Sequence, residues 1–231
     1  MESSAKEDQK RKFQDSDFRI EKVKEEYFEE ILTLIIESFI AREPLIGGLH
    51  LEKEEVSTYI SDLAKEWIKY EPSVCAVYIP ENKIVAVNLT KILTREEQKT
   101  FNAEEVSHYT PGVQKLIKIL INIENSFIVF EQDETAEKVL EVALLAADSE
   151  FSGNKLSYRM IQESERIAVE MGCRIATTQA SNIVSQHIFR KIGYENRFWI
   201  DYKDVEVDGI KPLDVSAMHG TTGAIVFFKF L

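Results

Sequence analysis

The feature that most constrains how this chain folds is residues 138–194, where strand-like and helix-like patterns alternate without a long break. An apolar run at residues 139–147 predicts a buried strand, and residues 148–154 form a short polar loop after it. An amphipathic helical segment follows, then a second short apolar run at residues 174–178 and a last helical segment. This order predicts an α/β protein. In such proteins a phosphorylated ligand sits at the loop between a strand's end and a helix's N-terminus.

The remaining segments extend this arrangement on both sides. Residues 1–16 are charged and serine-rich without periodicity, which predicts a disordered tail and a folded domain at residues 17–231. Further strands are predicted at residues 18–23, 74–79, 84–92, 198–202 and 224–231, and further helices at residues 25–40, 53–70 and 113–124. We therefore expect a mixed sheet of about seven strands with helices on both faces.

The charge balance bears on the partners of the chain. Its 40 acidic and 28 basic residues give a net charge of −12, whereas nucleic acids and anionic membranes need a basic face, so neither is expected as a partner. No apolar run approaches a membrane span and the N-terminus lacks the apolar core of a secretory signal, so we expect a cytoplasmic protein. Cys75 and Cys173 stand in no metal-binding spacing, so we expect no metal site and two reduced core thiols.

Several short motifs stand in order along the chain. They are Glu43-Pro44-Leu45, the loop Ser152-Gly153-Asn154-Lys155-Leu156-Ser157, the pair Ser181 and Ser185, the segment 189–194, and the C-terminal Asp201-Tyr202-Lys203, Lys211-Pro212 and His219. With the order of strands and helices, they resemble the GNAT family of acetyl-CoA-dependent N-acetyltransferases, and within it the arylalkylamine (dopamine) N-acetyltransferases of invertebrates. The resemblance covers roughly residues 18–231 and lies in the order and spacing of the motifs.

The resemblance implies a GNAT fold with acetyl-CoA as co-substrate. In that family, backbone amides of a loop after the fourth strand bind the pyrophosphate of coenzyme A, and the strand itself hydrogen-bonds the pantetheine arm. The residues implied in cofactor binding are therefore Val142, Ala143, Leu144, Leu145, Ser152, Gly153, Asn154, Lys155, Leu156 and Ser157.

The loop departs from the family pattern at Ser152, Lys155 and Ser157, where Arg or Gln, Gly, and Gly or Ala are usual. A lysine costs about 1 kcal/mol if its φ is positive. Its ammonium would instead pair with a phosphate, and the helix N-terminus still offers amides and a favourable dipole. The departure keeps a second interpretation open, namely a GNAT-fold protein that binds acyl-CoA with reduced or lost catalysis.

Glu43 is the candidate general base, which acetyl transfer requires because the amine arrives as an ammonium at pH 7. Pro44 disfavours helix at Glu43, so this residue stands where the first long helix is broken. It lies beside apolar Leu45 and Ile46, where burial would raise its pKa. The resemblance matches it to the Glu-Pro-Leu of the subfamily, while the alternative is an ordinary exposed glutamate.

Ser181 and Ser185 share a face only if both are helical, because they are four residues apart. The resemblance implies that one hydroxyl relays the amine proton and that the other, Ser185, protonates the leaving thiolate. The alternative makes Ser181 a helix N-cap and Ser185 an ordinary polar residue. Many family members place a tyrosine acid at the position of Phe189, which has no proton to give. The resemblance also implies a substrate-binding role for His219, against an ordinary loop histidine.

We therefore expect an enzyme that transfers acetyl from acetyl-CoA to a small amine, in particular an arylalkylamine such as dopamine, tryptamine or serotonin. Attack would be direct in a ternary complex, because Cys75 lies in an apolar strand that disfavours a thiolate nucleophile. A polyamine acceptor is a third interpretation, compatible with the acidic composition. Tyr27, Phe28, Tyr59 and Trp67 are expected mainly in the core. The acceptor, the acyl chain and the oligomeric state, monomer or homodimer, stay open.

Overall fold

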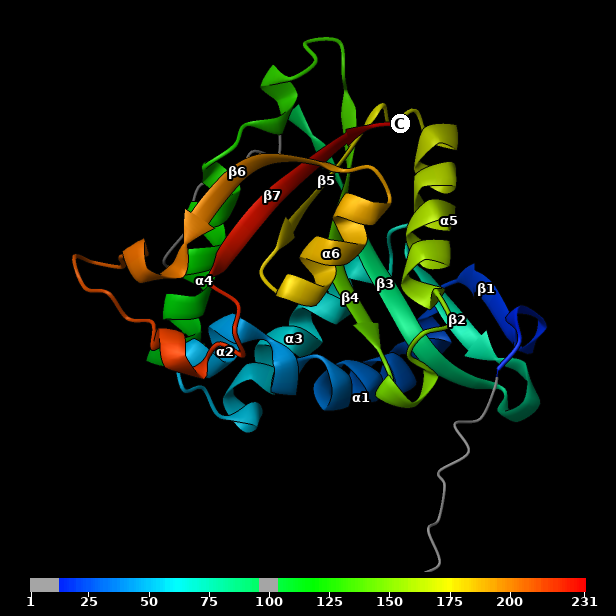
Figure 1. Cartoon of the computed structure of the whole chain (residues 1–231), viewed down its shortest axis with the longest axis horizontal. Coiled ribbons are helices and arrows are strands. Elements are labelled where there is room, and N and C mark those ends of the chain that lie inside the picture. The colour runs from blue at the N-terminus through cyan, green and yellow to red at the C-terminus, as the bar shows by residue number, and fades with distance from the viewer. Residues whose placement is uncertain (1–12, 96–103) are drawn as a thin grey trace, which may run out of the picture.

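The computed structural model describes residues 13–95 and 104–231, and these form one seven-stranded sheet in the order β1-β2-β3-β4-β5-β7-β6 (Figure 1). Its strands are β1 (Phe18–Lys22), β2 (Val74–Tyr78), β3 (Lys83–Thr94), β4 (Lys138–Ala147), β5 (Ile175–Ala180), β6 (Glu195–Asp201) and β7 (Gly223–Phe230). The α-helices in the described part are α1 (Phe28–Ser38), α2 (Pro44–Gly48), α3 (Lys53–Trp67), α4 (Pro111–Asn125), α5 (Leu156–Glu170) and α6 (Ile183–Lys191).

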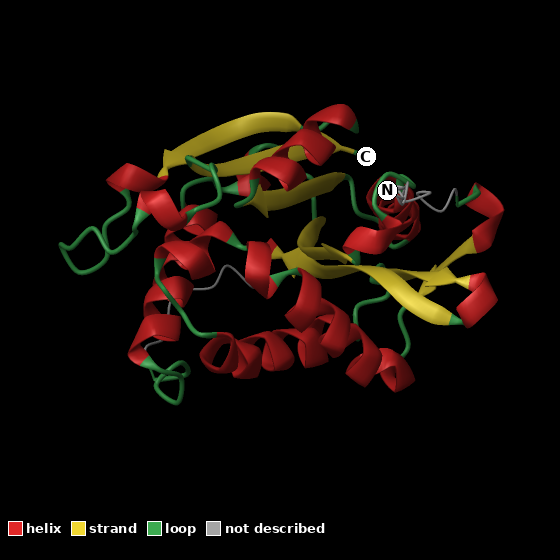
Figure 2. Cartoon of the chain, turned by 60° about the horizontal axis from the view of Figure 1, so that its bottom comes forward, coloured by secondary structure: helices red, strands yellow, loops and turns green. Residues whose placement is uncertain are grey.

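The sheet is mixed, as predicted. β4 and β5 pair in parallel, with α5 as the crossover between them, and the other neighbouring strands pair antiparallel. The parallel pairing is short, since it runs from Val139↔Ile175 to Glu141↔Thr177 and then stops, although both strands continue. From that point β4 and β5 diverge, and Figure 2 shows the strands in two groups with a space between them.

Helices cover both faces of the sheet, which confirms the predicted fold class. β2 shows how one strand serves both faces. Cys75 and Val77 pack in the cluster with α1, α3 and α4, whereas Val74, Ala76 and Tyr78 pack in the cluster with α5. This alternation follows from the two-residue period of a strand. α5 buries a helical stripe on its own side, and α5 and α6 lie in front of the sheet in Figure 1.

The segment after the first long helix differs from its prediction. Residues 25–40 were predicted as one helix, but α1 is flanked by short 3-10 turns at Glu25–Tyr27 and Ile40–Arg42. Residues 41–48 were predicted to be non-helical after the first long helix. In the structure a second short helix, α2, already begins at Pro44. A proline is well suited to the first position of a helix, where no amide hydrogen is needed. Glu43 thereby becomes the N-cap of α2.

The predicted tail overlaps the first described residues. Of the expected tail, residues 1–12 lie outside the described residues, but Phe13 packs its ring on Phe151 at 4.9 Å and also contacts Phe18 and Tyr78. Phe13 thus packs against the folded domain, whereas residues 14–16 after it are exposed. β6 begins at Glu195, three residues before its predicted start. The prediction missed these residues because they are polar and exposed.

Three further features concern chemistry and surroundings. Cys75 and Cys173 are both free and buried. Among residues 13–95 and 104–231, no helix combines the length and the apolar character that crossing a membrane requires. Within the same residues, no three His, Cys, Asp or Glu side chains gather in a way that would hold a metal ion.

Candidate active site

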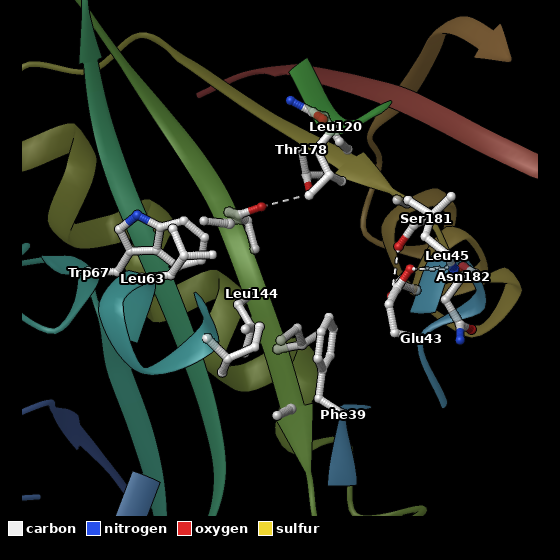
Figure 3. Close-up of a pocket in the computed structure, with 18 of the residues that line it drawn as sticks. Phe39, Glu43, Leu45, Leu63, Trp67, Leu120, Leu144, Thr178, Ser181 and Asn182 are labelled. Carbon is white, nitrogen blue, oxygen red and sulfur yellow. Dashed lines mark hydrogen bonds between the residues drawn. The ribbon is translucent and has the colours of Figure 1, made fainter. Parts of the chain in front are cut away.

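A cavity of about 540 Å³ opens where β4 and β5 diverge. Its wall is mostly apolar and combines residues from far apart in the sequence (Figure 3), labelled there as Phe39, Glu43, Leu45, Leu63, Trp67, Leu120, Leu144, Thr178, Ser181 and Asn182. Tyr59 and Trp67, which were expected mainly in the core, both line this cavity. The cavity therefore brings the predicted acidic and serine residues beside an aromatic and aliphatic wall.

Thr178 accounts for the way in which the two strands separate. Its Oγ1 donates to the carbonyl oxygen of Val142 at 2.8 Å, one residue beyond the last paired position (Figure 3). A side-chain hydroxyl of β5 thus bonds this carbonyl just past the end of the strand pairing. Val142, Ala143, Leu144 and Leu145 all line the cavity beyond this point. The strand edge that was expected to bind pantetheine is therefore exposed to the cavity.

The loop from Ser152 to Ser157 leads from the cavity into α5. Gly153 has a φ of +87° and nothing lies within 4 Å of where a Cβ would be, so the loop is open around it. Lys155 has a φ of +55°, the left-handed conformation that costs a non-glycine residue free energy, and it caps α5 without a side-chain hydrogen bond. Asn154 Nδ2 braces the loop by donating to the Phe151 carbonyl at 2.9 Å.

This loop and the β4 edge fit the diphosphate and the pantetheine of coenzyme A. The first amides of α5 have no carbonyl acceptor inside the helix, and the helix dipole favours an anion there. Leu156 is buried and anchors the start of the helix, while Ser157 lines the cavity. The exposed Lys155 adds a positive charge at the same end.

Glu43 is buried in the cavity wall and is not an ordinary surface glutamate. Its side chain is 7% exposed, its Oε1 accepts from the Leu45 amide at 3.3 Å, and its Oε2 accepts from Ser181 Oγ at 2.9 Å (Figure 3). Burial raises the pKa of Glu43 to about 7, against the opposing effect of these two hydrogen bonds. A carboxyl group with such a pKa can accept and release a proton at neutral pH.

The two serines do not lie on one helical face, because Ser181 precedes α6. Ser181 follows β5, and its carbonyl accepts from the buried Tyr202 hydroxyl at 2.7 Å. Asn182, and not Ser181, is the N-cap of α6. Ser185 lies in α6, and its Oγ donates to the Asn182 carbonyl at 2.8 Å. Both serines nevertheless line the cavity.

Other expected residues lie differently. His219 is exposed, has a φ of +50° and lies near Gly47, outside the cavity lining. Phe189 does line the cavity, but it is 2% exposed and its ring packs on Tyr194 at 5.0 Å. The structure thus brings together Glu43, Ser181, Ser185 and the β4 edge, and it leaves His219 apart from them.

An ion pair in the cavity wall, in which the Glu141 side chain is 8% exposed and that of Lys91 18%, was missed by the sequence analysis. Lys91 and Glu141 are register partners on β3 and β4, and their side chains approach to 2.7 Å. Burial alone would lower the pKa of Lys91, but the carboxylates of Glu141 and Glu124 raise it, so the lysine stays charged. The signal was present as a charged residue in the interior of each of two otherwise largely apolar strands.

The comparisons with known proteins identify the family and the fold. A family model described as the acetyltransferase (GNAT) family matches residues 45–194. Arylalkylamine N-acetyltransferase 2 from Aedes aegypti superposes with a TM-score of 0.79 at 21% identity, over 93% of this chain and 99% of that chain. A Drosophila melanogaster polyamine N-acetyltransferase, which forms N-acetylagmatine, superposes with a TM-score of 0.81 at 18% identity, over 93% of this chain and 100% of that chain. A chain of the NatC complex bound to Gag peptide and CoA superposes with a TM-score of 0.53 at 11% identity, over 93% of this chain and 99% of that chain.

Proposed function

The chain belongs to the GNAT family of acetyltransferases, and from this premise we propose that it transfers an acetyl group from acetyl-CoA to the amine of a small acceptor. The observation that carries the proposal is the buried Glu43 carboxylate, which accepts from Ser181 at 2.9 Å in the wall of the cavity. The exposed β4 edge at this cavity supports a role for acetyl-CoA as co-substrate.

The cofactor-binding residues follow from the same geometry. Backbone groups of Val142, Ala143, Leu144 and Leu145 would hold the pantetheine arm, in the way that an extended ligand adds to a strand edge. The amides of the loop from Ser152 to Ser157 would hold the diphosphate. Bound there, acetyl-CoA supplies an activated acetyl group.

Glu43 acts as the general base, directly or through a water molecule. Its carboxylate takes the proton that the acceptor ammonium must lose before the nitrogen attacks the acetyl carbonyl, and Ser181 relays this proton. As the C–N bond forms and the C–S bond breaks, Ser185 gives a proton to the leaving sulfur and recovers one, through water, from the nitrogen, which loses its second proton as the amide forms. Attack is direct, because Cys75 is fully buried and burial raises the pKa of its thiol to about 12.

An arylalkylamine is the first candidate acceptor, because Phe39, Leu63, Trp67, Leu120 and Leu144 give the cavity a wall suited to an aromatic ring. A polyamine is the second candidate, and a different observation favours it. The cavity lining also carries the carboxylates of Glu66, Glu105 and Glu124, beside the Lys91–Glu141 ion pair. Carboxylates at this density favour an acceptor with more than one positive charge.

The test is to incubate the purified protein with acetyl-CoA and a panel of amines and to titrate the released thiol. We expect release with phenylethylamine or tryptamine, and turnover of spermidine alone would assign the acceptor to the second candidate. If no amine releases thiol but coenzyme A binds tightly, the chain is a binding protein without turnover. An absence of heat from any acyl-CoA in calorimetry would overturn the proposal altogether.

A further inference from the structure

Besides the α-helical bond from the Gln186 amide to its carbonyl, Asn182 makes three contacts at the point where Glu43 meets the serines. Its side-chain Oδ1 accepts from the Val184 amide at 2.8 Å, which caps α6. Its backbone carbonyl accepts from Ser185 Oγ at 2.8 Å. Its side-chain Nδ2 donates to the Arg42 carbonyl at 2.9 Å, across 140 residues of sequence. The cap accounts for the first contact, but the third serves no purpose within α6.

The third contact fixes the backbone from which Glu43 projects. The carbonyl of Arg42 and the amide nitrogen of Glu43 belong to one planar peptide group, so a bond to that oxygen restrains the orientation of the whole group. The hydrogen bond from Ser181 to the Glu43 side chain joins the same two segments, because Ser181 precedes Asn182 and Glu43 follows Arg42. Two adjacent residues, Ser181 and Asn182, thus hold the Arg42–Glu43 segment together.

The other side of the junction is rigid. The Ser181 carbonyl accepts from Tyr202, which is 1% exposed, and the buried amide of Gln186 donates to the carbonyls of Ala180 and Gly223. The end of β5 is therefore fixed independently of the Glu43 segment. A donor that is fixed in this way can position the segment that it holds.

We propose that Asn182 is a positioning residue for acetyl transfer, holding Glu43 and Ser185 in register with Ser181 through its amide and its backbone carbonyl. The inference rests on the proposed function, in which Glu43 is the base. Loss of the Asn182 amide would free the Arg42–Glu43 peptide to rotate and would let water reach the carboxylate. Small displacements of a catalytic group cost a large factor in rate.

The test compares Asn182→Ser with Asn182→Ala. Serine keeps an oxygen that caps α6, but it lacks an amide of the same reach, whereas alanine loses both. For both variants we expect kcat to fall about tenfold with KM for acetyl-CoA unchanged, since the β4 edge is untouched. Only Asn182→Ala should also lose stability through its cap. Asp133→Ala, which removes a side-chain oxygen that accepts from the Thr135 amide at 2.9 Å outside the cavity lining, is the matched control and should keep wild-type kcat.

A second measurement does not depend on turnover. A ¹³C NMR titration should show that the pKa of Glu43 falls from about 7 toward its ordinary 4.5 in Asn182→Ser, because water then reaches the carboxylate. A wild-type pKa and a wild-type kcat in Asn182→Ser would overturn the inference, as would a loss confined to Asn182→Ala. If the wild-type protein turns over no amine, the proposed function fails, and the titration alone still decides whether Asn182 positions Glu43.

Discussion

At the scale of single residues, two opposing influences act on the Glu43 carboxylate. The 7% exposed side chain loses the hydration of its anion, which raises the pKa, while the Ser181 hydroxyl and the Leu45 amide stabilise that anion. Burial is the stronger influence, and the pKa of about 7 is the outcome. An exposed glutamate would be ionised but too weakly basic to accept a proton from an ammonium efficiently. The position thus suits a general base at neutral pH.

Replacing Glu43 with glutamine tests this role directly. We expect kcat near neutral pH to fall by about 10²- to 10⁴-fold, the usual contribution of a general base. The wild-type rate should rise with pH around a midpoint near 7, where Glu43 loses its proton. In Glu43→Gln the rate should recover partly at high pH, where the amine deprotonates without help.

Thiol release between pH 5 and pH 10 measures both profiles. Glu37→Gln, at an exposed position of α1, is the control and should match the wild type. The same pH–rate profile in Glu43→Gln and in the wild type would exclude Glu43 as the base.

At the scale of secondary-structure elements, the site depends on a sheet that pairs along the whole of β4 on one side, with one register shift, and only briefly on the other. β3 and β4 stay paired from Ala86↔Ala147 to Thr94↔Lys138, whereas β4 and β5 pair at Val139–Glu141 only. This long ladder, whose register shifts once between Leu89 and Thr90, holds β4 in place, so its other edge can stay open without loss of the fold. The Lys91–Glu141 pair belongs to this ladder.

The Lys91–Glu141 pair leads to a prediction about stability. Lys91→Met should lower the free energy of unfolding by about 3 kcal/mol, because Glu141 is then left as a buried charge without its partner. Adding Glu141→Leu should restore most of that loss, since an apolar pair of similar volume costs no desolvation. Urea unfolding of the two single variants and the double variant measures both effects, and an additive result would contradict the coupling.

The loop before α5 leads to a second prediction at this scale. Lys155→Gly should raise the free energy of unfolding by about 1 kcal/mol, because glycine adopts the positive φ of this position without steric cost. Coenzyme A should at the same time bind more weakly, since the ammonium near the diphosphate is lost. Calorimetry and urea unfolding on the same preparation separate the two effects. Stronger binding by the glycine variant would show that Lys155 hinders the ligand.

At the scale of the whole molecule, the buried Glu43 couples the active site to folding. Its carboxyl has a pKa of about 7 when folded and about 4.5 when unfolded. Between these values the unfolded chain is ionised at this residue while the folded chain keeps its proton, so stability falls as the pH rises. Its contribution is fully present below pH 4.5 and is lost above pH 7. The protein thus trades stability for a basic carboxylate in its interior.

This linkage predicts how Glu43→Gln changes stability. Glutamine cannot ionise, so the variant should gain on the wild type by about 3 kcal/mol between pH 4.5 and pH 8. Urea unfolding of both proteins at the two pH values gives this difference directly, and other titrating groups cancel in the comparison. A difference that does not change with pH would mean that Glu43 titrates alike in the folded and unfolded states.

The sequence by itself determined the sheet, the helices on both faces and the family, because these depend on local patterns. The alternating faces of β2 and the buried stripe of α5 are written in residues a few positions apart, and burial follows such periods wherever the chain packs. The order of the short motifs was enough to predict the family that the comparisons support. The start of β6 was missed because its polar residues do not show the apolar pattern on which such predictions depend.

Only the tertiary structure decided which groups meet in the cavity. Glu43 and Ser181 are 138 residues apart, and no local pattern records that Pro44 starts a helix whose N-cap is buried beneath β5. The contact of Asn182 with Arg42 and the pairing of Lys91 with Glu141 likewise depend on register and chain path, while His219 lies apart from both. Desolvation, which sets the pKa of Glu43, is a property of everything packed around a group and therefore exists only once the chain has folded.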